Sequence, residues 1–149
     1  MTERRGFTLI EVLVVLVVLC ALAAQAAPSL HRFVVRTKRT EAQAALLQLM
    51  QQQERFYSQH NRYIAFSSGA SDAQAKLFKW WSGGSAARSA YEIEGKACDG
   101  ELIEQCVQLI AMPGTAKVDQ VFKDEDCGQL ILTSNGQRLA TGAAPRCWP

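Results

Sequence analysis

The residue of the sequence with the clearest chemical requirement is a single carboxylate inside an apolar run. Glu11 is the fifth residue of the stretch 7–27, whose other side chains are almost all apolar. A charged side chain at the centre of a bilayer costs ~2.5–3.5 kcal/mol on insertion scales. Such a cost requires a partner or a function, and pairing with a positive charge in an apolar environment is the chemistry that this acid would support.

The cysteines are the second group that could do chemistry. Cys20 lies in the apolar run, whereas four more, an even number, lie in the polar part of the chain. If that part is outside the cytoplasm, two disulfides are expected. Cys98 and Cys106 flank a predicted turn, and Cys127 and Cys147 bracket a predicted hairpin, so these pairs are the prediction, although four cysteines allow three pairings.

No pattern in the sequence indicates catalysis or a bound cofactor. Nucleotide-binding loops, HExxH and GxSxG are absent, and His31 and His60 are 29 positions apart. Zinc is disfavoured because no C-x2-C pair occurs. Acidic residues at 119 and 124–126 raise the possibility of calcium, but without EF-hand spacing a solvated loop is the simpler interpretation. We expect no catalytic residue, no cofactor and no metal site, and therefore no enzyme.

The apolar run has the length of a membrane-spanning helix. Its 21 residues would extend about 31 Å as an α-helix, which matches the hydrocarbon core of a bilayer. Arg4 and Arg5 favour a cytoplasmic amino terminus, with the rest of the chain on the other side. Residues 23–27, AAQAA, resemble a signal-peptidase site, but Glu11 is unusual in the core of a secretory signal.

Hydrophobic periodicity predicts an α+β fold. Apolar residues recur every three or four positions after Pro28, so one helix is expected from about residue 8 to about residue 60, loosened near that proline. Alternation with period two predicts strands at 91–96, 107–111, 130–133 and 138–141, the last two joined by a type I′ turn at Asn135-Gly136. The expected architecture is a long amino-terminal helix, transmembrane in its first half, with a four-stranded antiparallel sheet packed on its carboxyl-terminal half.

The segment RGFTLIEV resembles the prepilin processing motif of type IV pilins. The segments AQAALLQLMQQQERFYSQHNRY and CGQLILTSNGQRLATG further resemble PilE-type minor pilins. The resemblance implies cleavage between Gly6 and Phe7, N-methylation of Phe7, and pairing of Glu11 with the new amino terminus of a neighbouring subunit. Pro28 falls where the family commonly has a proline. In the family, the last cysteine pair staples the carboxyl-terminal loop, in agreement with Cys127–Cys147.

The resemblance also implies a domain organisation and a set of partners. We expect a leader at 1–6, a transmembrane and fibre-core helix at 7–28, an amphipathic stem at 29–62, an αβ loop at 63–90 and a disulfide-stapled sheet at 91–149. The expected partners are other pilins in a helical fibre, the prepilin peptidase, the assembly platform of the inner membrane and, before assembly, the lipid bilayer. The chain would cross the inner membrane once, with its carboxyl-terminal part in the periplasm, and lie in a surface pilus after assembly.

The predicted function is that of a minor pilin in pilus assembly or priming, and so in twitching motility, adhesion or DNA uptake. The alternatives are a major pilin, a type II secretion pseudopilin, or a DNA-binding module at the pilus tip. Residues 29–62 carry six basic and two acidic side chains, whereas residues 91–126 carry nine acidic side chains and three lysines. The basic stem of one subunit and the acidic globular part of a neighbouring subunit could attract one another. The acidic segment disfavours nucleic acid as a partner, because it would repel the phosphate backbone.

Overall fold

The computed structural model of the chain describes residues 8–149, apart from the side chains of residues 25–28. The predicted processing residues Gly6 and Phe7 lie outside the described residues, and so does the side chain of Pro28. The chain forms two compact units, Met1–Arg36 and Thr37–Pro149, and each is considered by itself.

One long helix, α1, extends from Leu9 to His60. Its bounds agree with the expected 8–60, and the helix is continuous through position 28. Asn61 ends it with a φ of 55°, and its backbone N–H donates to the carbonyl of Tyr57 at 2.8 Å. Asparagine tolerates this left-handed conformation better than most residues, which explains the position of the helix end.

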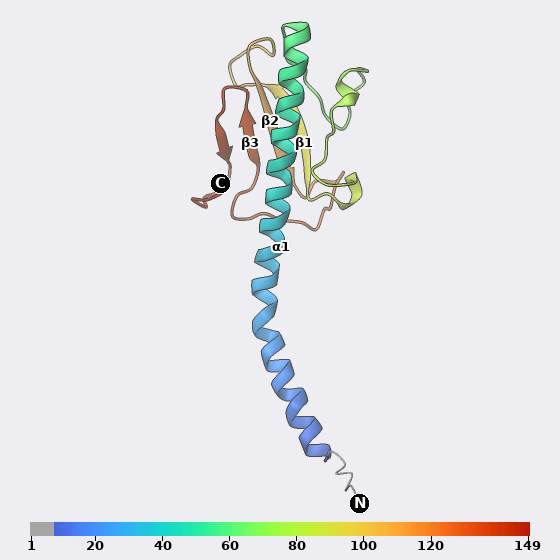
Figure 1. Ribbon diagram of the computed structural model, residues 1–149, viewed down its shortest axis with the longest axis vertical. Coiled ribbons are helices and arrows are strands. Elements are labelled where there is room, and N and C mark those ends of the chain that lie inside the picture. The colour runs from blue at the N-terminus through green and yellow to red at the C-terminus, as the bar shows by residue number, and fades with distance from the viewer. Residues whose placement is uncertain (1–7) are drawn as a thin grey trace, which may run out of the picture. The chain divides into compact units, whose positions relative to one another are not determined.

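Four strands follow and form one antiparallel sheet (Figure 1). They are β1 (Tyr91–Ala97), β2 (Val107–Pro113), β3 (Leu130–Thr133) and β4 (Arg138–Ala140), and they lie side by side in the order of the chain. Ile93 pairs with Ala111, which pairs in turn with Leu130. The α+β architecture predicted from the two periodicities is confirmed.

The core of the second unit lies between α1 and one face of the sheet (Figure 1). Ala42, Leu46 and Leu49 recur on one face of the helix, and all are buried. Register brings Ile93, Leu109 and Leu132 to one face of the sheet, because pleating turns alternate side chains to the same side. These helix and sheet residues belong to a single buried apolar cluster.

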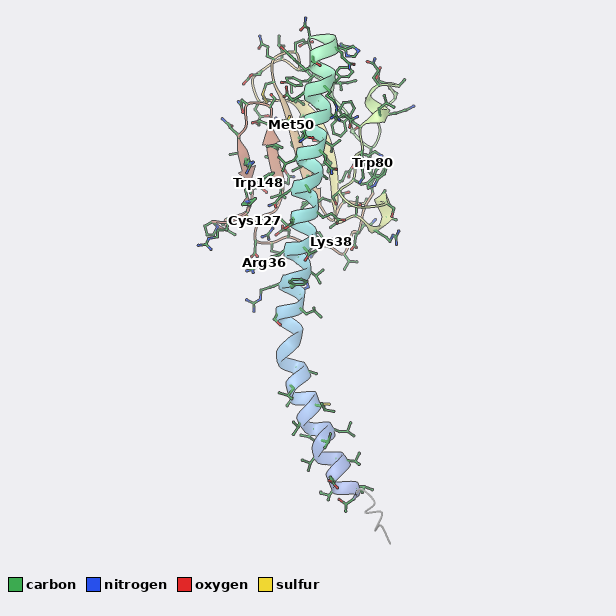
Figure 2. All side chains as sticks on the ribbon, in the orientation of Figure 1. Arg36, Lys38, Met50, Trp80, Cys127 and Trp148 are labelled. Carbon is green, nitrogen blue, oxygen red and sulfur yellow. A yellow bond between two sulfur atoms is a disulfide. The ribbon has the colours of Figure 1, made fainter. Side chains whose placement is uncertain are left out.

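In the structure α1 ends at His60, so the αβ loop comprises residues 61–90 rather than the expected 63–90, and it covers the outer edge of β1. Phe66 and Gly95 exchange two backbone hydrogen bonds of 3.0 and 2.9 Å, and the N–H of Ile93 donates to the carbonyl of Trp80 at 2.7 Å. Trp80, labelled in Figure 2, therefore lies beside the strand. An edge strand that is paired in this way presents fewer open backbone groups to other chains. The sequence SDAQAKLFKWW at 71–81 predicts a short α-helix from Asp72, whereas the loop contains two 3-10 turns, Ala75–Leu77 and Ala86–Arg88.

The β3–β4 hairpin has the predicted position but not the predicted turn. A type I′ turn needs positive φ at both Asn135 and Gly136. Among the residues that the structure describes, Asn61 is the only non-glycine with positive φ, so Asn135 does not meet this requirement. Gly136 has a φ of 86°, and Thr133 donates its N–H to the carbonyl of Gln137. The loop is therefore longer than two residues, with the left-handed position on the glycine alone.

Candidate functional site

The amino-terminal part of α1 exposes a continuous apolar surface. Side chains from Leu9 to Ala24 are all exposed, and α1 is long and apolar enough to cross a membrane. Glu11 lies in the first helical turn, where its N–H donates to the carbonyl of Thr8 at 3.1 Å. A lone carboxylate on an exposed apolar helix is suited to pairing with a cation after the helix has packed against others.

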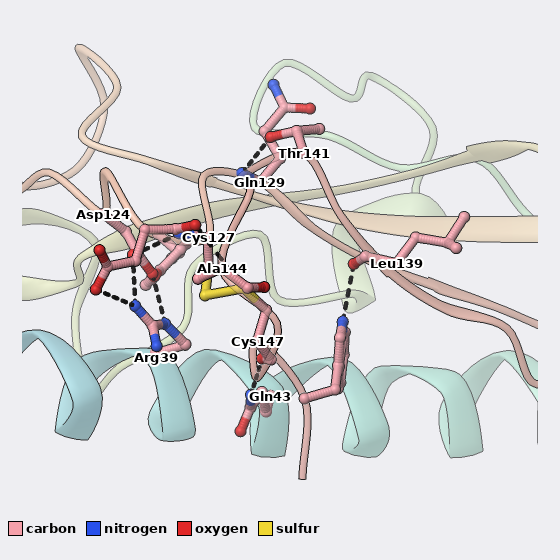
Figure 3. Close-up of a disulfide and its surroundings, with 12 residues drawn as sticks. Arg39, Gln43, Asp124, Cys127, Gln129, Leu139, Thr141, Ala144 and Cys147 are labelled. Carbon is pink, nitrogen blue, oxygen red and sulfur yellow. Dashed lines mark hydrogen bonds and ion pairs between the residues drawn. A yellow bond between two sulfur atoms is a disulfide. The ribbon is translucent and has the colours of Figure 1, made fainter.

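A buried ion pair joins α1 to the loop after β2. Arg39 Nε donates to Asp124 Oδ2 at 2.8 Å, and Nη2 donates to Oδ1 at 2.6 Å (Figure 3). The Tyr91 hydroxyl donates to the same carboxylate at 2.5 Å, and the Cys127 N–H donates to it at 3.1 Å. The Asp124 side chain has no exposed surface. Four donors thus hold one buried carboxylate between the helix, β1 and the carboxyl-terminal region.

These contacts set the ionisation of the cluster. Burial of Asp124 opposes ionisation, but the hydrogen bonds from Arg39, Tyr91 and Cys127 outweigh it and hold the pKa below its ordinary value. The pKa of Tyr91 is raised, first by burial and then by the hydrogen bond to Asp124. The pKa of Arg39 is also raised, chiefly by its hydrogen bond to Asp124. At neutral pH the cluster is therefore an Arg–Asp ion pair beside a neutral tyrosine.

Arg39 and Asp124 correct two expectations from the sequence. The basic residues Arg32, Arg36, Lys38 and Arg39 predict a solvated or inter-subunit cluster, and the acidic residues at 124–126 predict a solvated loop. Arg39 and Asp124 instead pair with each other inside one chain. Helical spacing could have predicted the burial of Arg39, because positions 39, 42, 46, 49 and 53 lie on one face of the helix and all are buried. A polar residue on such a face needs a partner. Gln53, the other polar residue there, exchanges hydrogen bonds with the backbone of Ile64 at 2.7 and 3.1 Å.

Both predicted disulfides are present. Cys98 pairs with Cys106, and Cys127 pairs with Cys147, whereas Cys20 is free and exposed. The second bond holds the carboxyl-terminal loop (Figure 3), where Gln43 Nε2 also donates to the carbonyl of Cys147 at 2.7 Å. Trp148 Nε1 donates to the carbonyl of Leu139 at 2.8 Å. Covalent and polar contacts together hold the end of the chain against α1 and β4.

A second carboxylate cluster ties the αβ loop to the loop after β2. Glu92 accepts from the Ser68 hydroxyl at 2.7 Å and from the Thr115 hydroxyl at 2.5 Å. Lys117 lies 3.8 Å from the same carboxylate and also donates to Ser68. Apolar and polar residues alternate over 91–96, a pattern that predicts Glu92 on the solvated face of its strand, whereas only 8% of the residue is exposed. The two loops cover it.

Charge is distributed unevenly over the second unit. The αβ loop carries four exposed cations and one acid; the cations are Arg62, Lys76, Lys79 and Arg88. Residues 91–149 carry nine acids and five cations. The expectation of an acidic globular part therefore describes the sheet and its loops, but not the αβ loop. Within the part of the chain that the structure describes, no group of three His, Cys, Asp or Glu side chains is placed to hold a metal.

Residues 28–131 match the family model described as type IV minor pilin ComP, DNA uptake sequence receptor. The chain belongs to this family. Residues 1–24 match the model of the prokaryotic amino-terminal methylation motif. A search of curated proteins returns no match. The family that was expected from RGFTLIEV is thereby confirmed, and the minor pilin has the apolar amino-terminal helix of a pilus subunit.

Two solved structures resemble the minor pilin. A type IV pilin from Shewanella oneidensis is 23% identical, with a TM-score of 0.47 over 77% of this chain and 98% of that chain. The non-core minor pilin PilV of Neisseria meningitidis is 18% identical, with a TM-score of 0.49 over 77% of this chain and 94% of that chain.

Family and fold are those of a structural subunit. Pilins of this family assemble with other pilins into a pilus, and the methylation motif with its apolar helix indicates membrane anchoring before assembly. The predictions for Gly6, Phe7, Glu11 and Pro28 concern processing and assembly, which are taken up below.

Proposed function

We propose that this minor pilin is a receptor for DNA in a type IV pilus. The observation that carries the proposal is the match of residues 28–131 to a family whose printed description is that of a DNA uptake sequence receptor. The match covers the stem and most of the globular part, which is the part a pilin can present to a ligand. Twitching motility and adhesion have no comparable observation in their favour.

The αβ loop supplies the side chains that such a receptor needs. Lys76, Lys79 and Arg88 are exposed, and the loop has an excess of three positive charges. Lysine and arginine bind the phosphate backbone of DNA and release its condensed counterions, a contribution that does not depend on base sequence. Our sequence-based argument against nucleic acid rested on residues 91–126, which lie outside this loop. That expectation stays untested, and the family description is a reason to test it.

Two matched triple variants test the proposal. Lys76, Lys79 and Arg88 are replaced by glutamine in one variant, and Lys123, Arg138 and Arg146 in the other. Both lose three exposed positive charges, but only the first loses them from the αβ loop. We measure DNA uptake by cells, and the DNA affinity of the purified full chain at several salt concentrations.

Loss of three phosphate contacts would lower the slope of log affinity against log salt by about 3. We expect this change, and lower DNA uptake, only in the αβ-loop variant. Equal losses in both variants would mean that net charge alone matters. Unchanged uptake in the αβ-loop variant would contradict the proposed surface.

Assembly into the pilus is the second part of the proposal. The prepilin peptidase would cut between Gly6 and Phe7 and methylate the new amino terminus of Phe7. Until assembly, the chain would remain anchored in the inner membrane with its globular part in the periplasm. On docking to the assembly platform, Glu11 would pair with the amine of a neighbouring pilin inside the fibre core. The motif match to residues 1–24 and the exposed apolar face of α1 support this sequence of events. Pro28 would allow local adjustment of the helix.

A further inference from the structure

A groove lies between the last turns of α1 and the αβ loop. It has a volume of about 320 Å³. Phe78, only 4% exposed, and the half-buried Phe56 supply buried aromatic surface to it, and their ring centroids are 6.2 Å apart. Leu77 stands at its rim with 74% of its surface exposed. The groove is therefore large enough and apolar enough to take one aliphatic side chain.

The rim of the groove is polar and carries positive charge. Arg55 from α1 lines it, together with the amides of Gln52 and Gln59. Arg55 also lines the adjoining hollow, where Lys79 lies. Lining residues of the groove include no carboxylate. An occupant that complements this surface would insert an apolar side chain and place acidic groups beside Arg55.

The loop between β1 and β2 has the complementary chemistry. Leu102 is at its centre with 64% of its surface exposed, and Glu101 and Glu104 on either side are exposed as well. The Cys98–Cys106 disulfide closes the loop. The N–H groups of Gln105 and Cys106 donate to the carbonyl of Leu102 at 2.9 and 3.0 Å, so the leucine is held in a fixed turn. A constrained loop loses less conformational entropy on binding than a free one.

We propose that the β1–β2 loop of one copy of this chain docks into the groove of a second copy. Leu102 would enter between Leu77 and Phe56, and Glu101 and Glu104 would lie beside Arg55. Leu102 is not among the residues that line the groove of its own chain, so the contact would form between two copies. It goes beyond DNA binding, since neither the groove nor the loop includes the three αβ-loop cations of the receptor test.

Such a contact buries little surface and is populated only where the local concentration of subunits is high. Stable interfaces bury about 1,200–2,000 Å² in total, which is more than one loop and one groove can supply. Two subunits in the same membrane or fibre meet at a high effective concentration, and a weak contact then becomes populated. We therefore expect the contact in membranes or fibres rather than in dilute solution.

The test places a photo-crosslinking amino acid at position 102 of the full chain, with Cys20→Ser to prevent disulfide-linked dimers. Cells that produce the chain with two different tags are irradiated, and crosslinked pairs that carry both tags are mapped by mass spectrometry. The matched control carries the crosslinker at position 121. Val121 is 87% exposed and lies outside the groove. We expect a mixed-tag dimer that maps to residues 52–60 or 74–78 from position 102, at least tenfold above the control.

Charge reversal then tests the pairing that we infer. Arg55→Glu should reduce the dimer at least tenfold, and Glu101→Arg with Glu104→Arg in the same chain should restore it. Crosslinks to another pilin, to lipid or to a different surface of the chain would overturn the proposal. A dimer that Arg55→Glu leaves unchanged would overturn it too. The crosslink yield does not measure DNA binding, so its failure is distinguishable from failure of the receptor proposal.

Discussion

Asp124 shows how one residue connects distant parts of the chain. Its carboxylate accepts from Arg39 on α1 and from Tyr91 on β1, and the backbone N–H of Cys127 ties it to the stapled carboxyl-terminal region. A buried ion pair of this kind contributes little over an apolar replacement of both partners, whereas loss of one partner leaves a buried charge unpaired. Asp124 is therefore a residue at which single substitutions have large effects.

Asp124→Asn should destabilise the globular part by ~3–5 kcal/mol, because it leaves the Arg39 charge uncompensated in a buried place. The free energy of unfolding is measured on the full chain in detergent by denaturant titration. Asp126→Asn is the control, since Asp126 lies 3.8 Å from Arg39 but its side chain is 72% exposed. Exposed pairs contribute about 0–1 kcal/mol. Similar losses in both variants would argue against the buried pair as the source of stability.

The same cluster predicts the pH dependence of stability. The lowered pKa of Asp124 means that the unfolded chain takes up the proton first on acidification. Stability from this group is present at neutral pH and is lost as the pH falls below about 4. The raised pKa of Tyr91 has the corresponding effect at high pH. Above about pH 10 the tyrosine loses its proton first in the unfolded chain, so the stability from this group is lost as the pH rises further. Unfolding of wild type and Asp124→Asn, compared between about pH 2 and about pH 7, should show a weaker acid dependence in the variant.

At the scale of elements, sequence patterns predicted the helix, the four strands and both disulfides. These features depend on periodicity and on short loops, which a single sequence contains. The contacts of the αβ loop could not be predicted, because they depend on what distant residues place opposite it. Phe66 and Trp80 lie in a Ser-, Gly- and Ala-rich segment, yet both pair with β1. Glu92 is buried by Ser68 and Thr115, which are 24 and 23 positions away in the chain.

Gly95 is the residue that lets the αβ loop approach β1. A Cβ at this position would lie 2.5 and 2.7 Å from the Phe66 ring and 3.1 Å from Leu109. Because both neighbours are buried, Gly95→Ala should lower the free energy of unfolding by about 1–3 kcal/mol, the usual cost of overpacking. Gly84→Ala is the control, since nothing lies within 4 Å of its Cβ position. Protease cleavage within residues 61–90 should become faster only in the Gly95 variant.

The two disulfides close loops of different length and should differ in effect. Eight positions separate Cys98 from Cys106, and 20 separate Cys127 from Cys147. In the chain-entropy model both bonds stabilise by about 2–4 kcal/mol, with the longer loop giving more. Serine pairs at each site, compared by denaturant titration, should therefore rank with the Cys127–Cys147 pair as the more damaging change. The opposite order would show that native-state contacts, rather than loop closure, decide the effect.

At the scale of the whole molecule, the minor pilin combines a unit that has a closed apolar core with a helix whose first part is apolar and exposed. The second unit has a closed core, two disulfides and satisfied buried charges. From Leu9 to Ala24 every side chain of α1 is exposed, and nearly all are apolar. This surface must be covered by lipid before assembly and by other helices afterwards. Glu11 is the one acid on it, so transfer from lipid to fibre is the step at which its charge has the largest effect.

Glu11→Gln should therefore reduce incorporation into pili at least tenfold while the chain is still made and folded. Glutamine has nearly the same shape but cannot neutralise the amine of a neighbouring subunit, and an unpaired charge in an apolar core costs several kcal/mol. Sheared fibres and membranes are compared by immunoblot for the amount of this chain, and mass spectrometry reports whether the leader has been removed. A variant whose leader is removed normally but which is not incorporated into pili would support the ion pair. Loss of processing alone would place the role of Glu11 at the peptidase, and normal incorporation of the variant would contradict the ion-pair account of assembly.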